Sequence, residues 1–263
     1  MNKTDFFTDG AAYERLMGRW SRLAGQVFLD WIAVPQGLRW IEIGCGTGAF
    51  TEELIKHRLP IELVALDPSP DQIAFARTRS SLAAVKFQTG DAQVLPFDDA
   101  VFDVAVMALV IHFLRDPLRG VVEAARVVGP GGWVVSYVWD YAMGGSPTAP
   151  VVAALKSLGF GTVSPPSAKA TSSSALRDLW LSAKLDDIET RVIPVAVTFA
   201  DFEEFWHSMT GPVGPVGKTI AEMSPDDVDR LRALLRTRTP TRPDGRVAYP
   251  ANATAIKGRK RLP

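Results

Sequence analysis

Apolar runs and amphipathic repeats alternate along the first half of the chain. The runs at 40–43, 61–66, 85–88, 101–109 and 133–139 have the length of buried β-strands. The segments at 50–58, 71–80 and 117–128 carry apolar residues at helical spacing. Strands that alternate with helices predict a parallel sheet with helices on its faces. The run at 101–109 is nearly continuous, which indicates a central strand.

The N-terminal segment predicts one long amphipathic helix. Apolar residues recur at three- and four-residue spacing between residues 13 and 32. Arg15, Arg19 and Arg22 fall on another face, which is typical of a solvated stripe. Because this helix comes directly before the first strand, we expect residues 1–36 to form a helical cap near the mouth of a ligand crevice.

The second half of the chain differs from the first in its composition and hydrophobic pattern. Glycine, proline and serine are frequent after Asp140, which predicts a mobile lid rich in loops. The later pattern predicts helices at 175–185, 201–209 and 225–238 and strands at 188–198 and 247–257. These two strands would complete the sheet.

A glycine-rich turn follows the first predicted strand. Gly44, Gly46 and Gly48 lie between that strand and a helical segment. Glycine allows positive φ angles and lets a ligand approach the backbone, while the helix presents unpaired N–H groups. Such a turn is typical of a nucleotide site at the carboxyl end of a parallel strand. Two alternatives stay open: Gly44, Gly46 and Ala49 also satisfy the dinucleotide fingerprint, and the segment can be a tight turn without a ligand.

Two aspartates stand at the ends of the next strands. Asp67 lies about twenty residues beyond the glycines, where a carboxylate accepts hydrogen bonds from the hydroxyls of a ribose. The alternative is that Asp67 caps the following helix together with Ser69. Asp91 follows the third predicted strand. Two roles stay open for it: a hydrogen bond to an adenine amino group, or a turn without a ligand.

Composition and charge narrow the classes of partner. Hydrophobic residues make up 47% of the chain and charged residues 22%, as in ordinary globular proteins. With 29 basic and 29 acidic residues the formal net charge is zero, so no field attracts nucleic acid or an anionic membrane. Cys45 stands alone, which excludes an internal disulfide and favours a role as a small filler. We find no signal peptide or membrane span and expect a cytoplasmic monomer or homodimer without nucleic-acid or membrane partners.

In their order and spacing these motifs resemble the class I S-adenosylmethionine-dependent methyltransferases, in particular the small-molecule group that includes the quinone and menaquinone C-methyltransferases. The similarity covers residues 40–139 and rests on 41–48, Asp67, 90–92, 95–97, 102–104, 123–126 and 130–132. More weakly, 13–22, 244–245 and 255–258 are similar to a bacterial methyltransferase subgroup. The segment 108–111 lacks an Asn-Pro-Pro-Tyr-like sequence, which argues against amino groups of DNA bases as the target.

The resemblance implies an α/β, Rossmann-like fold. Its sheet has seven strands, mostly parallel, with the last strand antiparallel, and the chain adds an N-terminal helix and a lid or cap insertion after the fifth strand. We therefore predict one methyltransferase domain over 1–263, with a helical cap (1–36), a cofactor-binding core (37–140), a lid (141–185) and a C-terminal part of the sheet with helices (186–263).

The resemblance also implies roles for single residues. S-Adenosylmethionine is the expected cofactor and S-adenosylhomocysteine the product. The backbone at 44–48 would hold the methionine moiety, Asp67 the ribose, Asp91 and Ala92 the adenine, and the Leu109 carbonyl the amino end. Tyr13, Met17 and Trp20 would close the pocket. The full predicted cofactor set is Tyr13, Met17, Trp20, Glu42, Gly44, Cys45, Gly46, Gly48, Asp67, Pro68, Asp91, Ala92 and Leu109.

Methyl transfer is an in-line displacement, so the protein mainly aligns the acceptor and excludes water. His112, after the fourth strand, is the candidate general base for a small-molecule acceptor, and the alternative is a structural or pocket histidine. Three histidines and one cysteine show no ligand spacing, so we predict no metal site. Two other functions stay open: a cofactor-binding sensor or scaffold without turnover, and a nicotinamide-dependent oxidoreductase.

Overall fold

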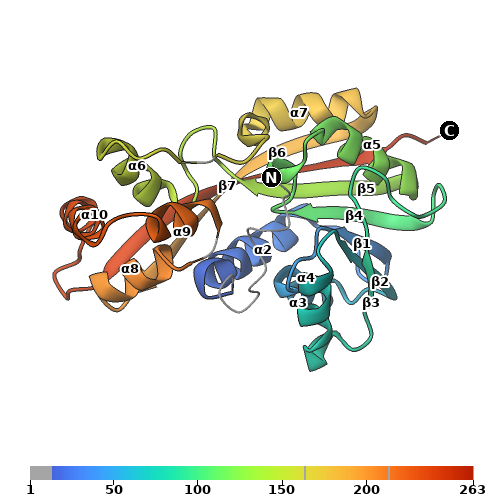
Figure 1. The fold of residues 1–263 in the computed structure, drawn as a ribbon. Coiled ribbons are helices and arrows are strands. Elements are labelled where there is room, and N and C mark those ends of the chain that lie inside the picture. Colours follow the sequence, from blue (N-terminus) through green and yellow to red (C-terminus); the bar gives the residue numbers. More distant parts are fainter. Residues whose placement is uncertain (1–13, 163, 213, 263) are drawn as a thin grey trace.

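A seven-stranded sheet forms the frame of the computed structural model, which describes residues 14–162, 164–212 and 214–262 (Figure 1). The strands are β1 (Arg39–Ile43), β2 (Glu62–Asp67), β3 (Lys86–Thr89), β4 (Phe102–Ala108), β5 (Val128–Trp139), β6 (Leu185–Phe199) and β7 (Val247–Lys260). Their order across the sheet is β3-β2-β1-β4-β5-β7-β6, and β7 runs antiparallel to β5 and β6. The predicted mostly parallel sheet with an antiparallel last strand is confirmed.

Helices cover both faces of this sheet (Figure 1). They are η2 (Glu14–Gly18, a π-helical turn), α2 (Arg19–Ile32), α3 (Ala49–Arg58), α4 (Pro70–Arg77), η3 (Ser80–Leu82), η4 (Ile111–Phe113), α5 (Pro117–Val127), α6 (Ala149–Ser157), η5 (Ala168–Thr171), α7 (Ser173–Ser182), α8 (Phe202–Met209), α9 (Gly214–Ala221) and α10 (Pro225–Arg238). Within the described ranges, none is both long enough and apolar enough to cross a bilayer.

Side chains of the central strands alternate between two buried clusters. In β1, Trp40 belongs to the cluster that contains Phe28 of α2, whereas Ile41 belongs to the cluster that contains Trp180 of α7. Neighbouring residues of β4 alternate in the same way. Successive residues of a strand point to opposite faces, so a strand covered on both sides needs a continuous apolar run. Packing on both faces of the sheet therefore holds the carboxyl ends of the parallel strands rigidly in place.

Polar residues at the strand ends start the helices that follow. The Ser69 hydroxyl accepts a hydrogen bond from the Gln72 backbone N–H at the start of α4. The Asp116 carboxylate does the same for the Arg119 N–H at the start of α5. Both helices have proline in their first turn, where no backbone donor is lost. Each of these helices thus begins at a defined residue, and the side chains next to that residue are fixed in position.

The N-terminal helix differs in detail from the prediction. A π-helical turn precedes α2, so the segment is two joined elements, and Tyr13 lies outside the described residues. Arg19, expected in a solvated stripe, bonds the Glu204 carboxylate of α8 at 2.7 Å and the Thr198 carbonyl at 2.6 Å. These partners come from elements far away in the sequence, so the pattern of α2 alone does not reveal them.

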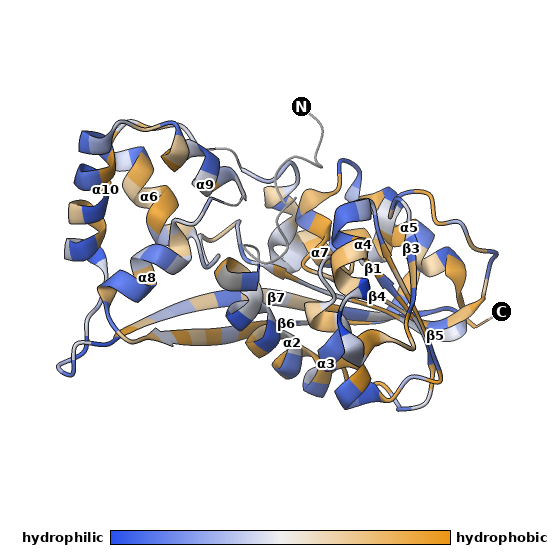
Figure 2. Ribbon diagram, turned by 60° about the horizontal axis from the view of Figure 1, so that its bottom comes forward, coloured by the Kyte–Doolittle hydropathy of each residue, from blue (hydrophilic) through white to orange (hydrophobic). Residues whose placement is uncertain are grey.

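Four helices gather at one end of the molecule, and we call α6, α8, α9 and α10 the cap helices. Figure 2 shows them beyond the main part of the sheet, reached by the long strands β6 and β7. The sequence pattern predicted α8 and α10 but neither α6 nor α9, because proline and glycine at their starts resemble loop composition. The helix α7 instead lies against the sheet, where the Trp180 indole donates to the Val134 carbonyl at 3.0 Å. The division into cap, core and lid by residue range stays a prediction.

Candidate active site

A cavity of about 510 Å³ opens where β1, β2 and β4 end, and we call it the first cavity. The glycine turn, the residues after β2, the segment after β3 and the segment after β4 line it. Among the residues predicted from the sequence, its lining includes Glu42, Gly44, Cys45, Gly46, Asp67, Pro68, Asp91, Ala92 and Leu109. Residues from four separate strand ends thus meet in one concave site, as expected at the switch point of an α/β sheet.

Two glycines of the turn have structural reasons to lack a side chain. Gly44 has φ +80°, and a Cβ there would lie 2.4 Å from a methyl group of Val110. Gly48 has φ +82° directly before α3, and a Cβ would lie 2.5 Å from Leu82. Gly48 does not line the first cavity, so it shapes the turn from behind. Both positions combine positive φ with close packing, which only glycine tolerates.

The backbone donors of the turn are already used inside the protein. The N–H groups of Gly44 and Cys45 both donate to the Leu66 carbonyl of β2, at 2.6 and 3.0 Å. The Gly46 N–H donates to the Asp67 carboxylate at 3.0 Å, and the Gly48 N–H to the Cys45 carbonyl at 2.9 Å. The turn is therefore held to β2 and offers few free donors to an anionic ligand.

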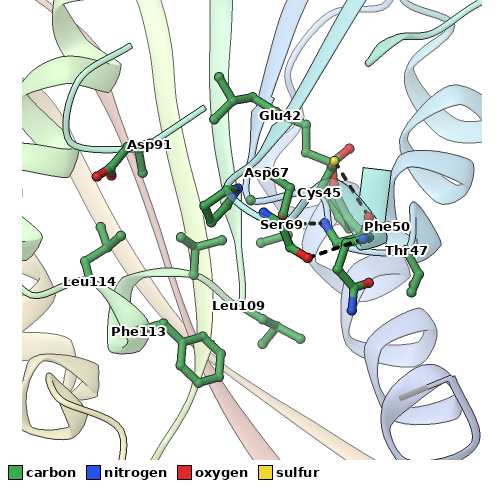
Figure 3. A pocket seen from close by; sticks show the side chains of 18 of the residues that line it. Glu42, Cys45, Thr47, Phe50, Asp67, Ser69, Asp91, Leu109, Phe113 and Leu114 are labelled. Carbon is green, nitrogen blue, oxygen red and sulfur yellow. Dashed lines mark hydrogen bonds between the residues drawn. The ribbon is translucent and has the colours of Figure 1, made fainter. Parts of the chain in front are cut away.

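Asp67 joins the glycine turn to the loop after β2. One carboxylate oxygen accepts from the Gly46 N–H, and the other accepts from the Ser69 N–H at 2.9 Å (Figure 3). Burial raises the pKa of this carboxyl above its ordinary value, and the two backbone donors offset part of that rise. The N-cap residue of α4 is Ser69, not Asp67. The structural role of Asp67 therefore does not use all the acceptor positions of its carboxylate. Each oxygen keeps a second lone pair for a ligand in the first cavity.

Glu42 is a fully buried acid on β1 that also lines the first cavity. Its pKa is raised to about 8, chiefly by burial; the nearby Thr51 hydroxyl offsets part of the rise, and the Asp67 carboxylate adds a smaller increase. Neither carboxyl oxygen makes a well-aligned hydrogen bond to any described residue. A buried acid without such a partner is costly, so this position suits a cationic group brought by a ligand.

Cys45 and the aspartate after β3 have less direct roles. Burial raises the pKa of the Cys45 thiol well above its ordinary value, which keeps it neutral and fits its interpretation as a small filler. Asp91 is exposed, and its side chain accepts from the Gln93 N–H at 2.9 Å, so it does form a turn. It also lies at the mouth of the first cavity beside buried Ala92.

The far wall of the first cavity comes from the segment after β4. Figure 3 shows Leu109, Phe113 and Leu114 across the cavity from Glu42 and Cys45. Leu109 has φ +61°, a left-handed conformation that is rare for residues other than glycine, asparagine and aspartate. Its N–H donates to the Tyr137 carbonyl at 2.8 Å, which holds this strained residue in place. Strained backbone at a ligand site is a common sign of function.

The remaining N-terminal residues do not all reach the first cavity. Trp20 is 1% exposed and packs against Phe199 and Tyr249 in the core. Met17 lines a different cavity, described below. Glu14, to which the sequence analysis gave no role, reaches the glycine turn instead. Its carboxylate accepts from the Thr47 hydroxyl at 2.9 Å and pairs with Arg79 at 2.9 Å. We call these three residues the Glu14 latch.

Several lining residues were not predicted. They are Ser21, Thr47, Ala49, Phe50, Leu66, Ser69, Gln72, Gln93, Ala108, Val110, Phe113, Leu114, Arg115 and Tyr137. Most of them lie next to a predicted strand end, so their position in the sequence could have indicated that they line the cavity. Ser21 and Tyr137 give no such signal, because α2 and β5 meet only in the folded protein.

A second cavity of about 380 Å³ adjoins the first, and Leu109 and Phe113 line both. His112 lines the second cavity from η4 and is 1% exposed. Its ring lies 4.1 Å from the Phe113 ring and 5.0 Å from the Tyr141 ring, between centroids. The structure thus places the predicted base candidate beside the predicted cofactor residues, in a separate compartment. Among the residues that the structure describes, no group of three or more His, Cys, Asp or Glu side chains is placed to hold a metal ion.

The strand order and the cavity at the ends of β1, β2 and β4 together define the class I methyltransferase fold. Residues 41–136 match the family model described as "Methyltransferase domain". The chain therefore carries a class I S-adenosylmethionine-dependent methyltransferase domain, as the sequence predicted, and S-adenosylmethionine is the cofactor of this enzyme class.

Similar proteins agree with this assignment. The chain is 41% identical over 95 residues to 2-methyl-6-phytyl-1,4-hydroquinone methyltransferase 2, chloroplastic, of Oryza sativa subsp. japonica, covering 36% of this chain and 27% of that protein. It is 37% identical over 98 residues to fatty-acid O-methyltransferase of Mycolicibacterium smegmatis, covering 37% of this chain and 36% of that protein. The chain thus spans only about a third of the length of these relatives.

A solved structure extends the likeness to nearly the whole chain. Phosphoethanolamine N-methyltransferase 2 of Haemonchus contortus, in complex with S-adenosyl-L-methionine, superposes with a TM-score of 0.61. The alignment covers 99% of this chain and 59% of that one, at 16% identity. At this identity the likeness concerns the fold alone.

Proposed function

We propose that the protein transfers a methyl group from S-adenosylmethionine to a small-molecule acceptor, with the cofactor in the first cavity. The observation that carries this proposal is a pair of acids beside the glycine turn, the fully buried Glu42 and the partly buried Asp67. S-Adenosylmethionine carries an ammonium and a sulfonium group, and its ribose presents two hydroxyls. Buried carboxylates are stable when they meet a cation or hydrogen-bond donors, so this cavity suits such a molecule.

Each group would hold a different part of the cofactor. Glu42 and the Leu109 carbonyl are available to the ammonium end, and the free lone pairs of Asp67 to the ribose hydroxyls. Asp91 and Ala92 border the place left for the adenine. The cofactor, when bound, supplies an electrophilic methyl group. The walls exclude water from it, and His112 in the adjoining cavity takes a proton from an acceptor that must lose one.

The donors of the glycine turn argue against a nicotinamide cofactor. A dinucleotide places its pyrophosphate on free backbone N–H groups at such a turn. Here the N–H groups of Gly44, Cys45 and Gly46 already have internal acceptors, and the Asp67 carboxylate adds negative charge. An anionic pyrophosphate would find these N–H donors already used and would lie beside the acids Glu42 and Asp67.

Calorimetric titration with S-adenosylhomocysteine, S-adenosylmethionine and NAD tests the cofactor assignment directly. We expect micromolar binding of the first two ligands and none of NAD. Protein that binds neither sulfur ligand would refute the proposal, and binding of NAD alone would favour an oxidoreductase. Incubation with S-adenosylmethionine labelled in its methyl group, over a broad acceptor panel, then tests transfer. Binding without any labelled product would favour a sensor or scaffold.

A further inference from the structure

The second cavity has the position of an acceptor site. It shares Leu109 and Phe113 with the first cavity, so a molecule in each would meet at this shared wall. Its volume of about 380 Å³ lies in the range of small-molecule sites. Two cap helices, α6 and α9, complete it together with Thr162, Ser164, Pro165, Pro166 and Ala168. The Ser167 N–H donates to the His112 carbonyl at 3.1 Å, and its hydroxyl to the Leu114 carbonyl at 2.8 Å.

The charges of the two cavities differ. The first cavity is lined by Glu42, Asp67 and Asp91, which suit a cationic cofactor. Among the described residues that line the second cavity there is no carboxylate, and the one permanently charged side chain is the exposed Lys156 of α6. An ammonium group would find no counter-ion here and would be repelled by Lys156, whereas an anionic group would be attracted to it.

The remaining walls suit an apolar, flat molecule. Phe113, Trp139 and Tyr141 supply aromatic surface, and Met17 and Val152 supply aliphatic surface. Aromatic side chains bind aromatic rings through offset or edge contacts in addition to burial. The polar side chains of the lining include Ser146 and Thr148 and, from η4, the buried imidazole of His112. A base among apolar walls is the chemistry needed by a nucleophile that must lose a proton.

We infer that the second cavity binds an apolar phenol or enol that is neutral or anionic, and that Lys156 selects against cationic acceptors. This inference rests on the proposed function. The acceptor hydroxyl gives its proton to the His112 imidazole, and its oxygen forms a bond to the methyl carbon. The bond from sulfur to that carbon breaks with its electron pair on sulfur. The products are a methyl ether and S-adenosylhomocysteine, and the imidazolium later returns the proton to water.

Three matched phenols test the charge preference. 3-(4-Hydroxyphenyl)propanoate, 4-propylphenol and tyramine share one ring and chain length and carry an anionic, a neutral and a cationic end. We measure the binding of each to the full-length protein saturated with S-adenosylhomocysteine, and the rate of labelled methyl transfer to each. Because Lys156 is exposed, we expect the anionic phenol to bind about fivefold more tightly than the neutral one, and tyramine more weakly than either.

Variants assign the preference to Lys156. Lys156→Gln should remove the advantage of the anionic phenol, and Lys156→Glu should reverse it in favour of tyramine. Lys169→Gln is the matched control, because Lys169 is exposed on the neighbouring η5 but does not line the second cavity. All three variants should keep the wild-type affinity for S-adenosylhomocysteine.

The outcomes separate the two proposals. Protein that fails to bind S-adenosylhomocysteine would refute the proposed function itself. Protein that binds it but binds none of the phenols, or binds tyramine as well as the propanoate, would overturn the inference and leave the proposed function standing. An unchanged preference in both Lys156 variants would also overturn it.

Discussion

Asp67 serves the fold and the site with the same two oxygens. It accepts backbone N–H groups from Gly46 and Ser69, which fixes the glycine turn against the loop after β2. The same side chain lines the first cavity. A single carboxylate at a strand end thus fixes the glycine turn and, in the proposed function, also binds the cofactor.

For Asp67 we expect that replacement by alanine weakens binding of S-adenosylhomocysteine by about 1.5–3 kcal/mol, the range for a hydrogen bond to a charged group. Isothermal calorimetry measures the loss. Asp67→Asn keeps one acceptor oxygen and should lose less. Asp98→Ala, an exposed acid in the loop after β3, is the control and should bind normally. An unchanged dissociation constant for folded Asp67→Ala would remove the ribose role.

His112 lies on the acceptor side of the shared wall, so its replacement should separate binding from turnover. His112→Asn is expected to leave the affinity for S-adenosylhomocysteine nearly unchanged and to lower kcat by about 10²–10⁴, the usual contribution of a general base. Parallel loss of cofactor binding would instead make His112 a structural residue of the pocket.

At the scale of elements, the N-terminal segment is held to the glycine turn by the Glu14 latch. Glu14 and Arg79 are 18% and 17% exposed, so water screens their pairing less than it screens the outer pairs of α2. Arg79 also bonds Glu52 of α3 at 2.9 Å, which ties η2, α3 and the end of α4 together beside the first cavity. The latch therefore orders a segment that borders the cofactor site.

Breaking the latch should loosen this segment and weaken cofactor binding. Glu14→Gln is expected to cost about 1 kcal/mol of affinity for S-adenosylhomocysteine and to speed proteolysis of the N-terminal segment. Glu204→Gln breaks the exposed Arg19–Glu204 pair at the start of α2 and serves as the control, with a smaller effect. Equal effects of both variants would show that the latch has no special role.

The strands were easier to predict from the sequence than the cap helices, because burial in a sheet imposes a hydrophobic pattern on a strand. The central strands follow from apolar runs such as 101–109, because they are covered on both faces. Helices α6 and α9 begin with proline and glycine, and their helical state depends on packing against neighbours such as α10. The residues of the first cavity at strand ends were predicted for the same reason. Ser21 and Tyr137 join the cavity, and Glu14 reaches the glycine turn, only through contacts between distant segments.

At the scale of the whole molecule, the buried acid Glu42 lowers the free energy of unfolding at neutral and basic pH. Glu42 has a pKa of about 8 in the folded protein against an ordinary value of 4.5. Between these pH values the folded state holds a proton that the unfolded state has lost, so stability falls as the pH rises from about 4.5 to 8. The full loss is of the order of 5 kcal/mol at most.

Glu42→Gln should therefore be more stable than the wild-type protein without ligand, by little at pH 5 and by several kcal/mol at pH 8. Urea unfolding at a series of pH values measures the difference. Glu222→Gln, an exposed acid at the end of α9, should show no such widening gap. The same Glu42 variant should bind S-adenosylmethionine more weakly, and a variant that is neither stabilised nor impaired in binding would contradict the role given to Glu42.

The position of β7 between β5 and β6 has a consequence for how the protein is made. As the chain leaves the ribosome, β1 to β5 can assemble the cofactor half at once, because each pairs with a strand already synthesised. β6 pairs with β7 alone and must wait for it. The strands whose ends line the first cavity can therefore pair before the cap helices, and with them the walls of the second cavity, have been synthesised.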